Sequence, residues 1–235
     1  MKGPKDLAKD QFFATPIWWA DSPEWVKELD KLMDTVVAHS KKLLKPALKE
    51  RNKKYGLKGE FGFVANSHNL MGMEGLEEFE RYVGATSFNL LDGQGYDLRN
   101  YKVMVTELWV QDFPKEGGGH RTLHTHWNSH MAGFFILKGS RLTSFPLFED
   151  PRPGKMQTML PEKDTKNETD ATYQVYYNSK PGRFIFFPGY VPHQFIMDHG
   201  VEPFRFIHFN CQAFPKHDDV FKVSPYDSPI LQGNQ

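Results

Sequence analysis

Cysteine is nearly absent from this chain of 235 residues, in which Cys211 is the single one. One thiol excludes an internal disulfide framework and suits a reducing compartment. Net charge is absent as well, because 29 Lys and Arg balance 29 Asp and Glu. No overall field therefore favours nucleic acid or an anionic membrane. We expect the partner to be a small molecule or a peptide, with no nucleic acid and no membrane.

Long apolar runs and internal repeats are also missing. No stretch approaches the length that spans a membrane. Residues 1–13 carry charges where a signal peptide needs an apolar segment. These features predict a cytoplasmic protein. A chain of this length lies within the range of one all-β or mixed domain with a full core.

Helical periodicity is found in the first part of the chain. A helix is predicted to begin at Ser22, with Pro23 at its first position, and to end before Pro46. Its apolar residues recur at spacings of three and four: Trp25, Leu29, Leu32, Met33, Val36 and Val37. A second helix is predicted after Gly75, with Leu76, Phe79, Tyr82 and Val83 on one side. The Lys-rich run 45–59 is interpreted as a solvated helix face, with a nucleic-acid patch as the alternative.

From Tyr101 the apolar period changes to two, and most of the 20 phenylalanines lie in short runs beyond this point. The predicted strands are 103–113, 132–138, 141–148, 171–178, 182–188, 193–197 and 204–214, with room for an eighth. Seven or eight short antiparallel strands are what a double-sheet jelly roll requires. The polar run 156–171 is interpreted as a mobile lid or rim insertion, or as a plain surface loop.

The predicted fold class is therefore mainly β (α+β), a jelly roll with N-terminal helices packed on one sheet. We expect one domain over 1–235. It divides into a helical support region 1–97, a β core 98–214 and a C-terminal tail 215–235.

Eight of the ten histidines follow residue 119. His124 and His126 are two positions apart, so on an extended segment their imidazoles leave the same face. His193 follows an apolar run closed by Pro188 and Gly189, where the mouth of a barrel would present it. Imidazole suits Fe, Zn, Cu and Ni, and a facial set of three ligands with open positions is the arrangement that non-haem iron oxygenases use. The alternative is that these are ordinary core or rim histidines.

Several motifs together resemble the Fe(II)- and 2-oxoglutarate-dependent oxygenases, and most closely a small group found in phages and marine bacteria. They are FATPIW (13–18), LWVQDF (108–113), HTHWNSHMAG (124–133), FEDPRP (148–153), GRFIFFPGYVPH (182–193) and HFN (208–210). The run 182–193 is also similar to the distal-His strand of JmjC-type hydroxylases. The resemblance implies a double-stranded β-helix, Fe(II), 2-oxoglutarate as cosubstrate, and oxidation of an unactivated C–H bond.

The resemblance also implies the metal ligands. His124 is the first, His126 stands where most of the wider superfamily has Asp or Glu, and His193 is the distal ligand. Three neutral imidazoles leave such a site one negative charge short. Either the site tolerates three histidines, or a carboxylate such as Glu149 or Asp150 coordinates. The segment His217-Asp218-Asp219 is a literal His-x-Asp, but it follows the strands and has no distal histidine after it.

A cation is needed for the distal carboxylate of 2-oxoglutarate. Arg205 shares one strand face with Ile207, Phe209 and Cys211, so we expect it to point inward and bind this carboxylate. A structural salt bridge is the alternative for this residue. Arg141 and Arg152 are the other candidates for the same role.

Three functions remain open at this point. The first is an Fe(II)/2-oxoglutarate-dependent hydroxylase that releases succinate and CO2. The second is a three-His cupin-type dioxygenase without 2-oxoglutarate, and the third is a metal-binding or purely structural jelly roll. A substrate entrance could be lined by Trp109, Trp127 and the loop 155–171. Core or rim packing is the alternative for the two tryptophans. Neither substrate nor oligomeric state follows from the sequence.

Overall fold

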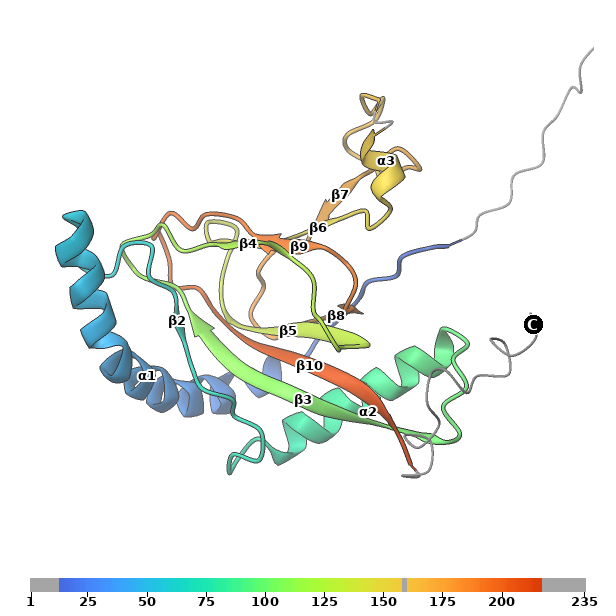
Figure 1. The fold of residues 1–235 in the computed structure, drawn as a ribbon, viewed down its shortest axis with the longest axis horizontal. Helices are drawn as coiled ribbons and strands as arrows, with labels where there is room; N and C mark the ends of the chain where they lie inside the picture. Colours follow the sequence, from blue (N-terminus) through green and yellow to red (C-terminus); the bar gives the residue numbers. More distant parts are fainter. Residues whose placement is uncertain (1–12, 158–159, 217–235) are drawn as a thin grey trace, which may run out of the picture.

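Two antiparallel sheets face each other in the computed structural model, which describes residues 13–157 and 160–216 (Figure 1). The larger sheet has the strand order β1-β8-β5-β10-β3-β2. Its strands are β1 (Trp18–Asp21), β2 (Ala65–Asn66), β3 (Tyr101–Asp112), β5 (Met131–Lys138), β8 (Arg183–Pro188) and β10 (Arg205–Pro215). The smaller sheet has the order β4-β9-β6-β7, with β4 (Arg121–His124), β6 (Pro146–Glu149), β7 (Gln174–Tyr176) and β9 (His193–Phe195).

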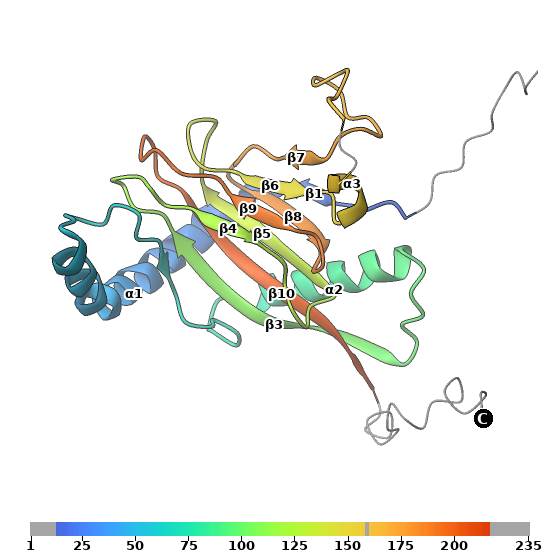
Figure 2. The ribbon, with the colours of Figure 1, turned by 45° about the horizontal axis from the view of Figure 1, so that its top comes forward.

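The eight strands from β3 to β10 pass between the two sheets at every step except from β6 to β7, in the manner of a double-stranded β-helix. Four of them, β8-β5-β10-β3, form the centre of the larger sheet, and β4-β9-β6-β7 form the smaller one. Figure 2 shows the smaller sheet lying over β5, β8 and β10. The mainly β jelly roll predicted from the strand count is confirmed.

The central strands of the larger sheet are buried on both faces, which explains their nearly continuous apolar sequences. On β5, Phe135 and Leu137 enter a core beneath the helices, whereas Phe134 and Ile136 enter the core between the sheets. We call these two clusters the helix-side core and the inter-sheet core. The smaller sheet contributes Phe148 and Phe195 to the inter-sheet core.

Two helices cover the outer face of the larger sheet, as expected (Figure 1). They are α1 (Val26–Tyr55), which follows a 3-10 turn η1 (Pro23–Trp25), and α2 (Glu77–Gly93); a short helix α3 (Pro153–Gln157) lies beyond β6. The prediction that the first helix ends before Pro46 is wrong. Pro46 lies inside α1 on an exposed part of the helix, where water can satisfy the carbonyl that loses its partner. The helix ends at Gly56, whose φ of 64° is left-handed.

Some strand boundaries also differ from the sequence prediction. Residues 141–145 form a turn before β6 instead of a strand, and Arg121–His124 form a short strand that is not among the predicted ones. The exposed Lys-rich run belongs mostly to α1. No helix in the described part of the chain is both long enough and apolar enough to cross a membrane. Most of the predicted tail, with His217-Asp218-Asp219, lies outside the described residues.

Gly133 tests how tightly the larger sheet is packed. A Cβ at this position of β5 would collide with the Phe209 ring and with the carbonyl oxygen of Ile185. We expect Gly133→Ala to lower the free energy of unfolding by about 1–3 kcal/mol, because neither neighbour has room to move. Gly93→Ala, at the end of α2 where an added Cβ meets nothing, should leave stability unchanged or slightly raised. Equal losses for the two variants in urea unfolding would contradict this packing.

Candidate metal centre

Strand pairing brings the distant histidines together. His124 ends β4, His193 begins β9, and the two are direct partners in the antiparallel pair. Residue 126 follows in the turn after β4, and its N–H donates to the carbonyl oxygen of Gly189 at 2.8 Å. The chain around residues 188–189 is therefore fixed against the chain that carries the first two histidines.

Gly189 is needed for this close approach. A Cβ there would collide with the backbone carbonyl oxygen of Ser129 and would lie 3.2 Å from that of His126. A larger residue would push the two segments apart and move His126 away from His193. The glycine noted at the strand end thus has a structural reason that concerns the site directly.

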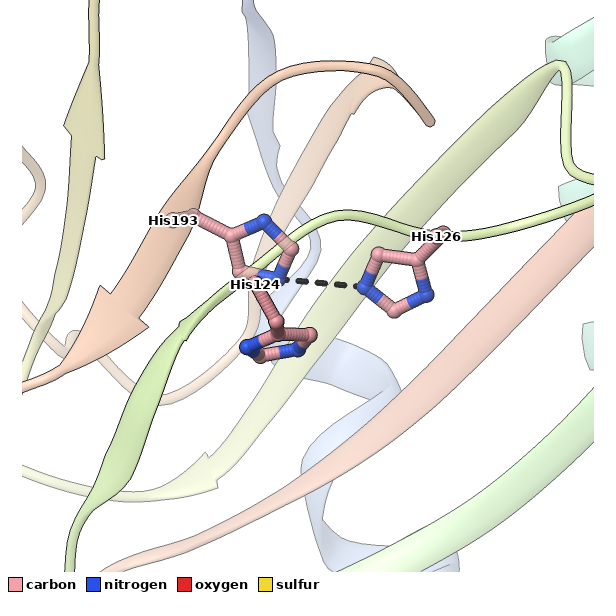
Figure 3. Close-up of side chains that lie close together, drawn as sticks. All are labelled: His124, His126 and His193. Atoms are coloured by element: carbon pink, nitrogen blue, oxygen red, sulfur yellow. Dashed lines mark hydrogen bonds between the residues drawn. The ribbon is translucent and has the colours of Figure 1, made fainter.

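The three rings gather at one point (Figure 3). One ligand atom from each of His124, His126 and His193 lies within 4.8 Å of the others, and His126 Nε2 is 3.1 Å from His193 Nε2. Ligand nitrogens about 2.1 Å from a metal ion and at right angles to each other stand about 3 Å apart. The spacing of these two nitrogens therefore fits a shared ion.

Hydrogen bonds select the nitrogens that face the ion. The Nδ1 atom of His193 lies 3.0 Å from the Val191 carbonyl oxygen, and that of His124 lies 2.7 Å from the Thr122 carbonyl oxygen. A carbonyl oxygen only accepts, so each Nδ1 carries the proton and each Nε2 presents a lone pair. Such backbone contacts also fix the ring orientation of metal ligands.

Burial keeps two of these rings neutral. Desolvation lowers the pKa of His193 to about 3 and that of His126 to about 4, and the neighbouring histidines act in the same direction. A metal ion needs the neutral imidazole. His193 is fully buried against Phe134, Phe148 and Phe187, whereas His124 is exposed. The centre therefore has one apolar, dry side and one side open to solvent.

His208 is a fourth histidine that the sequence analysis did not single out. Its Nε2 lies 3.4 Å from His126 Nε2, and its ring stacks between those of His126 and Trp109 at 4.7 and 4.2 Å. It is buried, and its Nδ1 is among the buried atoms of the described residues that lack a hydrogen-bond partner. Alternation along 204–214 could have found it, had the inward face been identified correctly.

Asn210 lies two residues further along β10 and connects to a carboxylate. Its amide nitrogen donates to Glu107 on β3, and its side chain also acts on His126, where it opposes the lowering of the pKa. Glu107 is thus connected through Asn210 to the ring of His126. Such outer carboxylates orient metal-binding imidazoles.

The two carboxylates considered from the sequence lie elsewhere. Asp150 is bonded to Arg152 and Lys155, which hold its pKa well below the usual range. Glu149 accepts a hydrogen bond from Gln174. Within the described residues the potential ligand cluster contains three histidines and no carboxylate. The structure thus agrees with the three-His alternative.

The expected inward direction of Arg205 needs correction. Its guanidinium donates to Asp112 at 2.8 Å, to Asp30 at 3.0 Å and to Asp34 at 2.6 Å, and the last two belong to α1. The row that it heads, with Ile207, Phe209 and Cys211, packs in the helix-side core. The structure therefore shows the salt-bridge alternative and does not bring Arg205 to the histidines.

The other two arginines are also separated from the three rings. Arg141 is exposed in the turn between β5 and β6. Arg152 is exposed and forms its ion pair with Asp150 beside a different cavity. Neither lines the cavity that contains the histidines.

A cavity of about 440 Å³ opens beside the histidines. Aromatic residues form its inner wall, and polar residues surround its rim. The lining consists of Asn66, Ser67, Trp109, Gln111, Arg121, Thr122, His124, His126, Phe134, Phe195, Phe206 and His208. Trp109 thus lines the site, whereas Trp127 is 87% exposed in the turn after His126.

Comparison with known proteins agrees with the sequence resemblance. Residues 107–210 match the family model described as "Putative 2OG-Fe(II) oxygenase". This segment includes the three histidines, Glu107 and Asn210. No curated protein matches the chain.

The chain is also similar to several solved structures. A prolyl-4-hydroxylase from Pseudomonas putida has 11% identity and a TM-score of 0.48, with 83% of this chain and 92% of that chain covered. AviO1 from Streptomyces viridochromogenes Tue57 has 14% identity and a TM-score of 0.49, with 84% of this chain and 90% of that chain covered. The viral collagen prolyl hydroxylase of Paramecium Bursaria Chlorella virus-1, in complex with 2OG, has 10% identity and a TM-score of 0.46, with 83% of this chain and 96% of that chain covered.

Replacing His193 tests the centre. We expect His193→Ala to reduce the iron content after anaerobic reconstitution from near-stoichiometric to background, because it removes the most buried ligand. Metal analysis of the desalted protein measures this. His120→Ala is the control, since His120 is exposed and contacts its own glycine-rich loop. Unchanged iron content in the His193 variant would refute the site.

The pKa values predict an acid-sensitive metal-free protein. His126 and His193 have lower pKa values folded than the ordinary 6.5. Between these values the unfolded chain binds more protons, so stability is lost as the pH falls from about 6.5 towards 4 and 3. Thermal unfolding of the metal-free protein should show this, with a shallower dependence for His193→Ala. The same slope for both proteins would contradict the assignment.

Proposed function

We propose, from the match of residues 107–210 to the 2OG-Fe(II) oxygenase family model, that the protein hydroxylates a substrate with release of succinate and CO2. The observation that carries the proposal is the gathering of three neutral imidazoles at the open end of a double-stranded β-helix. Iron and 2-oxoglutarate are the cofactors that this family uses. His124, His126 and His193 would hold Fe(II).

Bound iron with 2-oxoglutarate and O2 supplies the oxidising chemistry, in which one oxygen atom enters the substrate and the other enters succinate. The protein contributes position and environment. Phe134, Phe148 and Phe187 surround His193 and exclude water from the inner side. The side of exposed His124 is left open for the substrate.

A second candidate function is supported by the ligand set itself. Three histidines without a carboxylate are also the set of a cupin-type dioxygenase that needs no 2-oxoglutarate. The family segment favours the first function over the second. The two differ in whether 2-oxoglutarate is bound and consumed.

For the substrate, we propose a small molecule or a peptide segment and not nucleic acid. Among the described residues, Arg121 is the lone Lys or Arg that lines the cavity, and the chain carries no net charge. Neither the cavity nor the chain as a whole would therefore attract a polyanion. We also propose a cytoplasmic location, because the single Cys211 is buried and unpaired.

Succinate formation tests the proposed function without knowledge of the substrate. Oxygenases of this type turn over 2-oxoglutarate slowly in the absence of substrate, so purified protein with Fe(II), 2-oxoglutarate and O2 should release succinate. His193→Ala should reduce the rate to that of free iron, because free iron alone remains. Mass spectrometry measures the product. An iron-loaded protein that consumes O2 with a candidate substrate but never forms succinate would support the cupin-type function instead.

A further inference from the structure

Arg121, at the start of β4, is a half-buried cation that forms no ion pair with any of the described residues. We propose that it binds the distal carboxylate of 2-oxoglutarate, an inference that rests on the proposed function. It lines the same cavity as His124 and His126. It lies three positions before His124, a distance of about 10 Å along an extended chain. The arginine side chain and a five-carbon dicarboxylate can together span that distance.

The guanidinium of Arg121 is held by neutral acceptors. Its Nε donates to Gln111 Oε1 at 2.8 Å, and its Nη2 donates to Asn66 Oδ1. In the described part of the chain it forms no ion pair, in contrast to Arg205, which has three. These two bonds leave the N–H groups of Nη1 available, while they fix the plane of the fork.

Burial makes this arrangement unfavourable without a ligand. Desolvation lowers the pKa of Arg121, which shows that its environment disfavours the charge. A charge removed from water and left unpaired costs free energy, and a carboxylate that binds it recovers that cost. Arginine suits this role because its planar fork matches a carboxylate with charge-assisted hydrogen bonds.

The rest of the cavity fits the middle of such a ligand. Phe134, Phe195 and Phe206 form an apolar wall in the same cavity as Arg121 and the histidines. Methylene groups between two carboxylates would pack there. The cavity-facing row of β10 carries Phe206 and His208 and so supplies no cation. Arg121, from the neighbouring sheet, supplies it instead.

Two ligands of equal length test the role. 2-Oxopentanoate has the chelating end and the five carbons of 2-oxoglutarate but lacks its distal carboxylate. Affinities for both are measured anaerobically by calorimetry on the protein loaded with Mn(II), so no turnover is needed. The wild type should bind 2-oxoglutarate roughly 10- to 100-fold more tightly than 2-oxopentanoate.

In Arg121→Gln this preference should disappear, while the affinity for 2-oxopentanoate stays the same. Arg121→Lys should keep part of the preference, because it retains the charge but loses the fork. If Arg121→Gln does not bind Mn(II), the Arg121→Lys variant alone tests whether Arg121 binds the distal carboxylate. Arg152→Ala is the matched control, an exposed arginine outside the cavity, and should behave as wild type.

The outcomes separate this inference from the proposed function. An unchanged preference for 2-oxoglutarate in the Arg121 variants would overturn the role of Arg121 and leave the oxygenase intact. Equal binding of both acids by the wild type would likewise exclude a carboxylate anchor. Failure of a Mn(II)-loaded wild type to bind either acid would overturn the proposed function itself.

Discussion

The pairing of β4 with β9 is the constraint on which the candidate site depends. It makes His124 and His193 direct partners. The same pairing brings His126 close to His193, although 67 positions separate these two residues along the chain. The pair is held over the larger sheet by aromatic contacts, among them Phe195 stacked on Phe206 at 4.4 Å. Phe195 and His193 belong to the same short strand. A change in the inter-sheet core therefore moves a metal ligand as well as lowering stability, because close-packed interiors transmit strain.

The larger sheet serves two purposes with its two faces. One face of β10 packs against the helices through Ile207, Phe209 and Cys211. Arg205 on the same face forms ion pairs with Asp30 and Asp34 of α1. The alternate residues Phe206, His208 and Asn210 face the inter-sheet side and surround the histidines. The helices thus stabilise the platform without entering the site. One strand carries both functions because its side chains alternate.

The features that sequence alone predicted are those with a local signal. A His-x-His before an apolar strand and a histidine after a Pro-Gly strand end predicted the three-histidine cluster, and short aromatic runs predicted the jelly roll. The inward face of β10 was assigned wrongly because FRFIHFNCQAF carries apolar residues on both of its faces, as expected for a strand buried on both sides. His208 and Asn210 were missed for that reason. Arg121 was missed because RTLH lacks an apolar pattern, so β4 was not among the predicted strands.

Charge connects the three-His set to the nature of the ligand. Three neutral imidazoles offset none of the charge of a bound dication, and Glu107 acts only through Asn210. The ion therefore keeps a stronger attraction for anions than it would beside a ligating carboxylate. Arg121 places a second, unpaired positive charge on another wall of the same cavity. A ligand with one carboxylate could pair with only one of these two cations, whereas a dicarboxylate can place one carboxylate on each. The lack of a carboxylate in the described ligand cluster thus favours a dianionic cosubstrate.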